Sequence, residues 1–437
     1  MRERFVRRIV AFTVALGAAT PAVVAGQSPG VWGRVSFTAV TSTARDSGVE
    51  RGFTELITTV TLQSAAADRG GSEFGIDFRG AAYPGTEDRT RRLSVYEAFV
   101  GHRLAGGRIG ARVGQVWLNE LGALGSLGGL HVEYRQPMGT RRTRVRAGAF
   151  GGLEPKILDA GYVGDVRKFG AYLALDGAGA RRHVVGLVAV RNQGLRERSV
   201  LTFSNVVPAG RGFFLYQAGE YDLEGPGGQG SGGLTYFFAN ARYAGLKLLE
   251  FQGSYHRGRS VDARTITLDQ LNGRPVSQQA LAGLLFESVG GRIWVNLGKH
   301  SRVFAGYSQD RNNREDEPTG RTTLGFFSSN LFRSGLDLSV SDIRTHRPDS
   351  SYDAWDVTLG RSFSSKVYLS GGYSSALSVF RPVEAGFLVE NRPRTHRYLA
   401  SGIVYLSRHI SLVLTGERLR DGTLTELRGM SNLAYRF

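Results

Sequence analysis

The carboxyl-terminal segment, residues 427–437, alternates between two kinds of side chain. Every second position, counted back from the end, gives a mostly apolar and aromatic set: Phe437, Tyr435, Leu433, Ser431, Gly429 and Leu427. The positions between them are mostly polar or small: Arg436, Ala434, Asn432, Met430 and Arg428. A period of two is that of a β-strand, whose successive side chains point to opposite faces. The segment is therefore predicted to be a strand with one face in lipid and the other in water.

The same unit repeats along the chain from residue 31 onward. Runs of about ten alternating residues are separated by Gly, Ser, Asn or charged clusters, which is typical of membrane-spanning strands. In residues 73–83, Phe74, Ile76 and Phe78 share one face and Asp77 and Arg79 the other. Counting these runs predicts an all-β fold, a transmembrane antiparallel β-barrel of about 22 strands, with 18 or 20 left open because two runs are weak.

The connections between the runs alternate in length. One set is short, such as residues 177–181 and 407–409, and the other is mostly longer and more polar, such as residues 41–52, 259–280 and 377–395. Short periplasmic turns and longer extracellular loops are the rule for barrels of the outer membrane. The alternation predicts that both chain ends of the barrel lie on the short-turn side.

The terminal Phe437, preceded on the same face by Tyr435 and Leu433, gives the chain a family resemblance. It resembles bacterial outer-membrane β-barrel proteins, whose last strand commonly ends in Phe and is read by the barrel-assembly machinery. The resemblance implies that Leu433, Tyr435 and Phe437 form the assembly signal. It also implies a location in the Gram-negative cell outer membrane, with lipid and lipopolysaccharide around the barrel. Porins of this class are often trimers, so a homo-oligomer is possible.

The first 25 residues are predicted to be a signal peptide. Four arginines precede an apolar stretch, residues 9–19, that is too short to span a bilayer as a helix, and small residues follow it. An uncleaved anchor is disfavoured because Pro21 interrupts the apolar run. Strand-like sequence begins soon afterwards, so residues 26–437 are expected to form a single barrel domain without a separate plug. The chain has no Cys, hence no thiolate metal site or disulfide.

The charge of the chain does not indicate a nucleic-acid partner. The sequence has 55 Lys and Arg against 38 Asp and Glu, a formal net charge of +17, but the basic residues are dispersed and form no patch or arm. A water-soluble all-β protein is also disfavoured, because aromatic residues cluster near the ends of the runs, as in the girdles of membrane barrels.

No residue pattern predicts an enzyme, a cofactor or a metal site. None of the eight His has the close spacing of a metal motif. His409 and Ser411 form a His-x-Ser similar to that of outer-membrane lipid-A deacylases and phospholipases, but the flanking signature is missing and a turn role is favoured. The glycine-rich residues 225–233 lack the Lys and helix of a phosphate loop and are expected to be an external loop.

The inward face of the runs carries the charged residues. Assigning each apolar set to lipid leaves these residues as the predicted pore lining: Asp77, Arg79, Glu97, Arg112, Glu133, Arg135, Arg144, Arg146, Arg191, Glu250, Asp337 and Asp356. Cations lead in the first half and acids in the second, which predicts opposed walls and a transverse field. The alternative is that these positions are polar only because water is there. His131, Glu133 and Arg135 are expected to form a salt-linked wall.

Residues 119–129 are a loop of low charge with Leu121, Leu124 and Leu127 three positions apart. It could fold into the lumen as a short constricting helical turn or lie as an apolar loop at the outer rim. Taken together, the sequence predicts a porin-like channel for passive diffusion of small hydrophilic solutes or ions, with a weak anion preference. The alternative is an assembly, secretion or adhesion barrel whose pore is closed.

Overall fold

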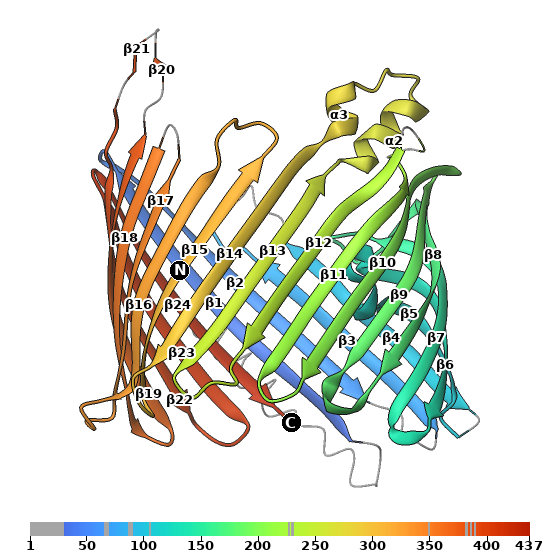
Figure 1. The fold of residues 1–437 in the computed structure, drawn as a ribbon, viewed down its shortest axis with the longest axis horizontal. Helices are drawn as coiled ribbons and strands as arrows, with labels where there is room; N and C mark the ends of the chain where they lie inside the picture. Colours follow the sequence, from blue (N-terminus) through green and yellow to red (C-terminus); the bar gives the residue numbers. More distant parts are fainter. Residues whose placement is uncertain are drawn as a thin grey trace.

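Each strand of the wall pairs antiparallel with the next strand in the chain, and the last strand pairs with the first. In the computed structural model this gives one closed sheet of 22 strands (Figure 1). The structure describes residues 30–64, 70–85, 91–104, 106–225, 228, 231–347, 350–380, 383–384, 387–388 and 390–437. The predicted signal peptide lies outside them. The predicted fold class, and the family resemblance as far as it concerns the fold, are confirmed.

The amino-terminal half of the wall consists of β1 Val31–Asp46, β2 Val49–Ser64, β3 Gly71–Ala82, β4 Arg92–Leu104, β5 Ile109–Trp117, β6 Ser126–Met138, β7 Thr140–Pro155, β8 Tyr162–Asp176, β9 Arg182–Asn192, β10 Leu195–Ala209 and β11 Phe213–Glu224. The other half consists of β12 Ser231–Tyr243, β13 Leu249–Ser260, β14 Leu284–Asn296, β15 Ser301–Asn312, β16 Thr319–Leu331, β17 Leu336–His346, β18 Ser350–Ser364, β19 Val367–Phe380, β22 Arg394–Tyr405, β23 Ile410–Asp421 and β24 Leu424–Arg436.

The two ends of the barrel differ in their connections (Figure 1). One end, the loop end, carries α2 (Ala263–Leu271), α3 (Gln278–Ala282) and the small hairpin of β20 (Val383–Glu384) and β21 (Phe387–Leu388). The other, the turn end, carries the short connections, η2 (Ala178–Ala180) and both ends of the barrel sequence. The predicted asymmetry is confirmed. Among the described residues, no helix is long and apolar enough to cross a membrane.

The predicted long loop at residues 41–52 is wrong. β1 and β2 continue through this segment and pair up to Asp46 and Val49 across a two-residue turn. Ser47 and Gly48 both have positive φ, 48° and 88°. Such a turn matches the right-handed twist of a hairpin, and Gly adopts it at no steric cost. The two strands therefore continue through the polar residues that had suggested a loop, and the connection is only Ser47 and Gly48.

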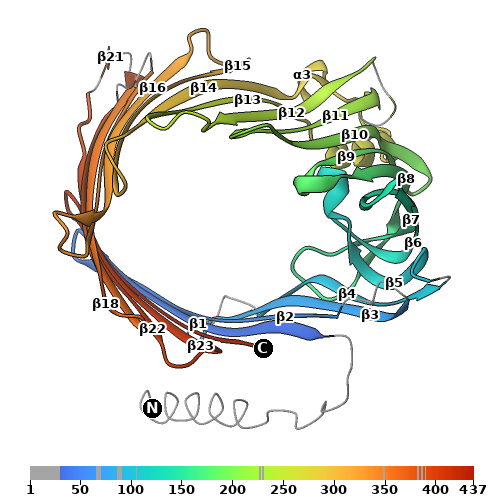
Figure 2. The same ribbon diagram turned by 60° about the horizontal axis from the view of Figure 1, so that its bottom comes forward.

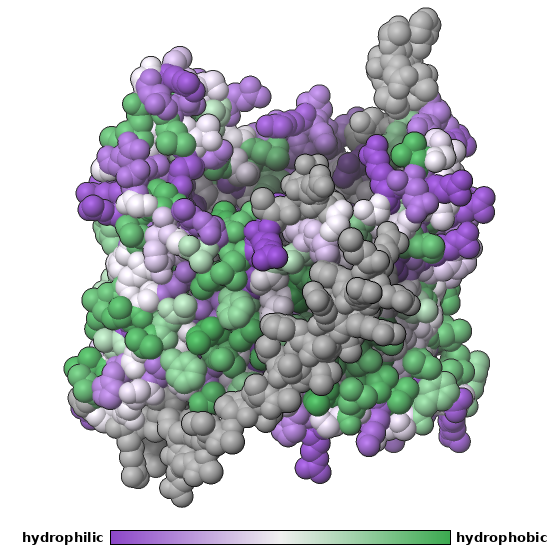
Figure 3. Space-filling model, turned by 180° about the vertical axis from the view of Figure 1, so that it is seen from behind, coloured by the Kyte–Doolittle hydropathy of each residue, from purple (hydrophilic) through white to green (hydrophobic). Residues whose placement is uncertain are grey.

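The outer face of the wall is apolar. Register pairing places Val113 opposite Leu130, and Leu173 opposite both Ala147 and Val185. Large apolar side chains on this phase are open to the surroundings: Leu173 is 56% exposed and Val113 58%. The face seen in Figure 3 has hydrophobic residues gathered in its lower half and hydrophilic ones toward the loop end. A band of apolar side chains around a closed sheet is the surface that a bilayer requires.

Candidate functional site: the inner wall of the barrel

The segment between β5 and β6 folds into the barrel. It contains the 3-10 helix η1 (Asn119–Leu124), which contacts β9 and β10 on the inner face (Figure 2, teal). Gly122 breaks the helix with φ 57°, a value that Gly adopts without a steric penalty. Of the two positions open to residues 119–129, the structure selects the one inside the lumen.

A hydrophobic cluster holds η1 against the wall. Leu118, Leu121 and Leu127 are at most 2% exposed. They pack in one cluster with residues from the inner faces of β4, β5 and β7–β9: Phe99, Val116, Phe150, Tyr172, Ala174, Val184 and Val188. Gly186 leaves room for this packing, because a Cβ there would lie 2.6 Å from a methyl carbon of Leu121. Burial of these side chains fixes η1 to one side of the lumen.

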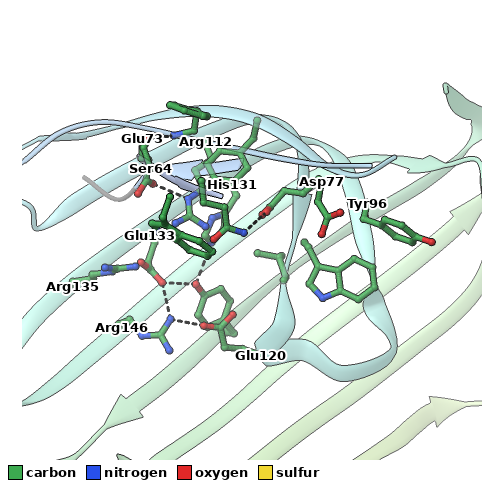
Figure 4. Close-up of a pocket in the computed structure, with 18 residues that line it drawn as sticks. Ser64, Glu73, Asp77, Tyr96, Arg112, Glu120, His131, Glu133, Arg135 and Arg146 are labelled. Atoms are coloured by element: carbon green, nitrogen blue, oxygen red, sulfur yellow. Dashed lines mark hydrogen bonds and ion pairs between the residues drawn. The ribbon is translucent and has the colours of Figure 1, made fainter. Parts of the chain in front are cut away.

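An ionic network borders the cluster on the same wall (Figure 4). Glu133 lies at its centre, with its side chain 4% exposed. It forms an ion pair with Arg135, and it accepts a hydrogen bond from Arg146 at 3.0 Å and one from the Tyr172 hydroxyl at 2.7 Å. The Glu133 carboxylate thus has two guanidinium groups and one hydroxyl as partners, which offsets the cost of burying its charge.

The network extends to both sides of Glu133. Glu73 on β3 pairs with Arg112 at 2.7 Å and with Arg103 at 3.3 Å. Arg146 also binds Glu120 of η1 at 2.8 Å, so the network ties the inward segment to the wall electrostatically as well. The sequence prediction of a salt-linked wall around Glu133 is confirmed by these contacts.

A cavity of about 550 Å³ opens between this network and the inner faces of β2–β4. Asp77 and Glu97 are register partners on β3 and β4, and both line the cavity. Arg112 and Arg135 line it too, and Figure 4 shows them with Asp77. No ion pair joins Asp77 or Glu97 to a base within the described part of the chain. The same cavity is therefore lined by acidic and by basic side chains. Opposite charges facing one cavity set up a local electric field.

The helix α2 closes over the loop end of this wall. Arg264 binds Glu197 at 2.7 Å and Glu154 at 2.9 Å, and Ile266 and Thr267 are buried. Hydrogen bonds from Thr265 lower the pKa of the Asp262 carboxyl, which caps the helix. A second cavity, of about 700 Å³, lies between this segment, Gly122 and the wall.

A different arrangement lines the opposite wall, on β14–β16. Register pairing places Arg292 and Trp294 of β14 on the inner face with Arg302 and Phe304 of β15. The Arg302 guanidinium carbon is 4.4 Å from the Trp294 ring centroid, and that of Arg292 is 4.9 Å from the Phe304 centroid. Neither arginine forms an ion pair with any residue that the structure describes. Rings instead of carboxylates hold these guanidinium groups in place, so their N–H groups stay available.

The register assigns most of the predicted lining residues to the inner face. These are Asp77, Arg79, Glu97, Arg112, Glu133, Arg135, Arg144, Arg146, Glu250, Asp337 and Asp356. Arg191 is the correction. It pairs with Arg167 on the same phase as Leu187, and its guanidinium carbon lies 5.5 Å from the ring of the outward Phe169. The prediction that Arg191 lines the lumen is therefore wrong.

The prediction of one cationic and one acidic wall is also wrong. The arginines of the first half are interleaved with Glu73 and Glu133, which pair with them. In the second half the inner phase carries arginines as well as acids, as in the pair of Arg242 with Glu250 at 2.6 Å. Charge is therefore balanced locally along much of the wall.

Sequence reasoning missed four residues of the network, namely Glu73, Arg103, Glu120 and Tyr172, and both arginines of the opposite wall. Glu73 begins its strand run in phase with Asp77, so phase alone could have indicated it. The partners of Arg103 and Tyr172 lie on other strands, and a single sequence carries no signal for those pairings.

Comparison with known proteins finds no family model and no curated protein that matches this chain. Several solved structures are similar to it at low identity. Pseudomonas aeruginosa OpdQ shares 7% identity with a TM-score of 0.43, covering 93% of this chain and 98% of that one. Pseudomonas aeruginosa OpdL shares 10% with a TM-score of 0.44, covering 93% and 98%. Acinetobacter baumannii OccAB4 shares 9% with a TM-score of 0.42, covering 94% and 99%.

Proposed function

We propose that this protein is a porin-like channel of the cell outer membrane, through which small hydrophilic solutes or ions diffuse passively. One observation carries the proposal: the closed barrel has an apolar outer face and an inner face with charged side chains from strands all around the wall. Outside the buried ionic network, charged side chains on an inner face of that kind are stable in contact with water. Since η1 packs against one wall, it narrows the lumen from one side.

The proposed path passes between two unlike surfaces. On one side lie η1 and the cavity with Asp77, Glu97 and Arg112. On the other lie Arg292 and Arg302, whose charges have aromatic neighbours in place of acids. The proposed weak preference for anions rests on these two arginines, because Arg112 and Arg135 are already ion-paired. Dissolved salt screens exposed charges over about 10 Å at 0.1 M, so the preference decreases as salt rises.

The size limit of the proposed channel can be tested by swelling of proteoliposomes in solutions of sugars of increasing mass. The wild type should admit small sugars. Leu121→Ala removes a fully buried anchor of η1 and should change the size limit, because η1 is then no longer held in its place against the wall. Leu173→Ala, at an exposed position on the outer face, is the matched control and should leave the limit unchanged. Absence of swelling for all sugars, with folded barrel present, would contradict the proposal.

The alternative is a closed barrel for assembly, secretion or adhesion, which the α2–α3 segment at the loop end favours. The same preparation distinguishes the two. A partner protein that co-purifies in stoichiometric amount from detergent-solubilised membranes, together with absent swelling, would support the alternative and reject the channel.

A further inference from the structure

Two arginines lie directly opposite each other on the outer face of the barrel near the loop end. Arg167 of β8 and Arg191 of β9 are register partners, and both are exposed. They share their face with Phe169 and Leu187, which are 40% and 52% exposed. The guanidinium of Arg191 lies over the Phe169 ring, which fixes its position at the membrane-facing surface.

Like charges directly opposite each other on adjacent strands destabilise a sheet. No ion pair joins Arg167 or Arg191 to an acid among the residues the structure describes. The nearest acid on the same strand and phase, Asp165, forms no described ion pair; its main-chain carbonyl accepts a hydrogen bond from the Gln193 N–H. The third arginine of this row, Arg196, is the next register partner of Arg191 and is neutralised by Glu224. Among the residues that the structure describes, the Arg167–Arg191 pair therefore has no ion-paired acid.

The pair lies at the upper limit of the apolar surface. On β8 the outer phase runs through Leu175, Leu173, Ala171 and Phe169, all apolar, and then reaches Arg167. On β9, Arg191 is one residue from the end of the strand. In a bilayer this is the level of the headgroups of the leaflet on the loop side. The anionic groups that are concentrated at this depth are those of the lipid headgroups.

We infer that Arg167 and Arg191 form a lipid-binding site that takes the phosphate group of an outer-leaflet lipid headgroup, the chemistry of the phosphates of lipopolysaccharide. A phosphate has oxygens enough to accept from both guanidinium groups, and Arg suits it because its donors form a planar fork. Its negative charge removes the repulsion between the arginines. The inference rests on the proposed membrane placement and is independent of whether the channel conducts.

The test uses the whole barrel in nanodiscs of phosphatidylcholine, with and without added lipopolysaccharide, and measures the unfolding temperature. Wild type should gain stability from lipopolysaccharide. The double variant Arg167→Gln, Arg191→Gln should lose most of that gain, and without lipopolysaccharide it should be at least as stable as wild type because the repulsion is gone. Arg344→Gln is the matched control, because this outward arginine already pairs with Asp342 at 3.0 Å. It should keep the full gain.

Three results would overturn the inference. The double variant could keep the gain from lipopolysaccharide, or it could be destabilised equally in both kinds of nanodisc, which is the behaviour of residues with a structural role only. Inorganic phosphate alone could also give wild type the whole gain in phosphatidylcholine nanodiscs, which would assign the site to the free ion and not to a lipid. Because the readout is stability, a failure here leaves the channel proposal untouched, and a silent channel leaves this site untouched.

Discussion

Gly33 and Phe437 exchange two backbone hydrogen bonds and close the barrel. The Gly33 N–H donates to the Phe437 carbonyl at 3.0 Å, and the Phe437 N–H donates to the Gly33 carbonyl at 3.2 Å. The Phe437 ring also lies over Gly33, since a Cβ on Gly33 would be 3.0 Å from it. This contact ends the seam between β1 and β24, which register pairing continues up to Thr425. Without the seam both strands would have open edges in lipid.

Deleting Phe437 should prevent assembly, because it removes both hydrogen bonds at the end of the seam and the last residue of the predicted assembly signal. The expected result is unfolded protein in the periplasm and loss of the heat-modifiable band in electrophoresis. Gly33→Val, which pushes a side chain into the Phe437 ring and the Thr61 carbonyl, should reduce the band more weakly. A normal band for the deletion variant in the outer membrane would contradict this role for Phe437.

Arginine substitutions should distinguish the two faces of the wall. Phe78, Val132 and Leu173 are on the outer phase, and Ser339 is on the inner phase. Arg near mid-depth of the lipid-facing side should cost about 2–4 kcal/mol, while Ser339→Arg should cost little because its charge stays in water. Unfolding by denaturant in lipid vesicles measures both. Equal tolerance of the two faces would show that the assigned phases are incorrect.

Glu133 should contribute strongly to the stability of the inner wall. Glu133→Gln leaves Arg135 and Arg146 without their shared carboxylate in a buried site, so the expected loss is about 3–5 kcal/mol. Glu250→Gln breaks a pair whose arginine is 51% exposed and should cost at most about 1 kcal/mol. Denaturant unfolding of both variants gives the comparison. Similar losses for the two would mean that the Glu133 network is solvated.

The sequence predicted strand phase well where one face is apolar and the other polar. Phe78, Val132 and Leu173 fall on the outer face for that reason. The prediction failed at Arg191 because β9 is apolar on both faces: its inner residues Val184 and Val188 pack on the cluster around η1. A period of two then carries no information on which face is outward. Arg191 was therefore assigned to the water-filled lumen because it is charged, although it lies on the outer face at the edge of the apolar band.

The candidate site was predictable only in part. The spacing of Leu121, Leu124 and Leu127 indicated a segment that could turn inward. The sequence did not show against which strands of the barrel this segment would pack. Ion pairs such as Arg103 with Glu73 join side chains from different strands, and their formation depends on register and bulges that composition does not reveal. For this reason the sequence overstated the free positive charge on the first half of the wall.

Ion preference should depend on Arg292 and Arg302. Reversal potentials of wild type in a KCl gradient should show a modest preference for anions that weakens at high salt. Arg292→Glu with Arg302→Glu should shift the reversal potential toward cations, because these groups have no acid partner among the described residues and face the lumen. Arg344→Glu on the outer face should leave it unchanged. An unshifted potential in the double variant would place both arginines away from the conducting path.

Single-channel recording of the purified barrel in a planar bilayer tests the proposed channel most directly. The barrel, folded as judged by heat-modifiable migration, should insert and give discrete, reproducible conductance steps, with no cofactor or energy source added. The steps should persist in both directions of applied voltage, because passive diffusion through an aqueous lumen requires no driving partner. A silent bilayer at high concentration of correctly folded protein would contradict the account.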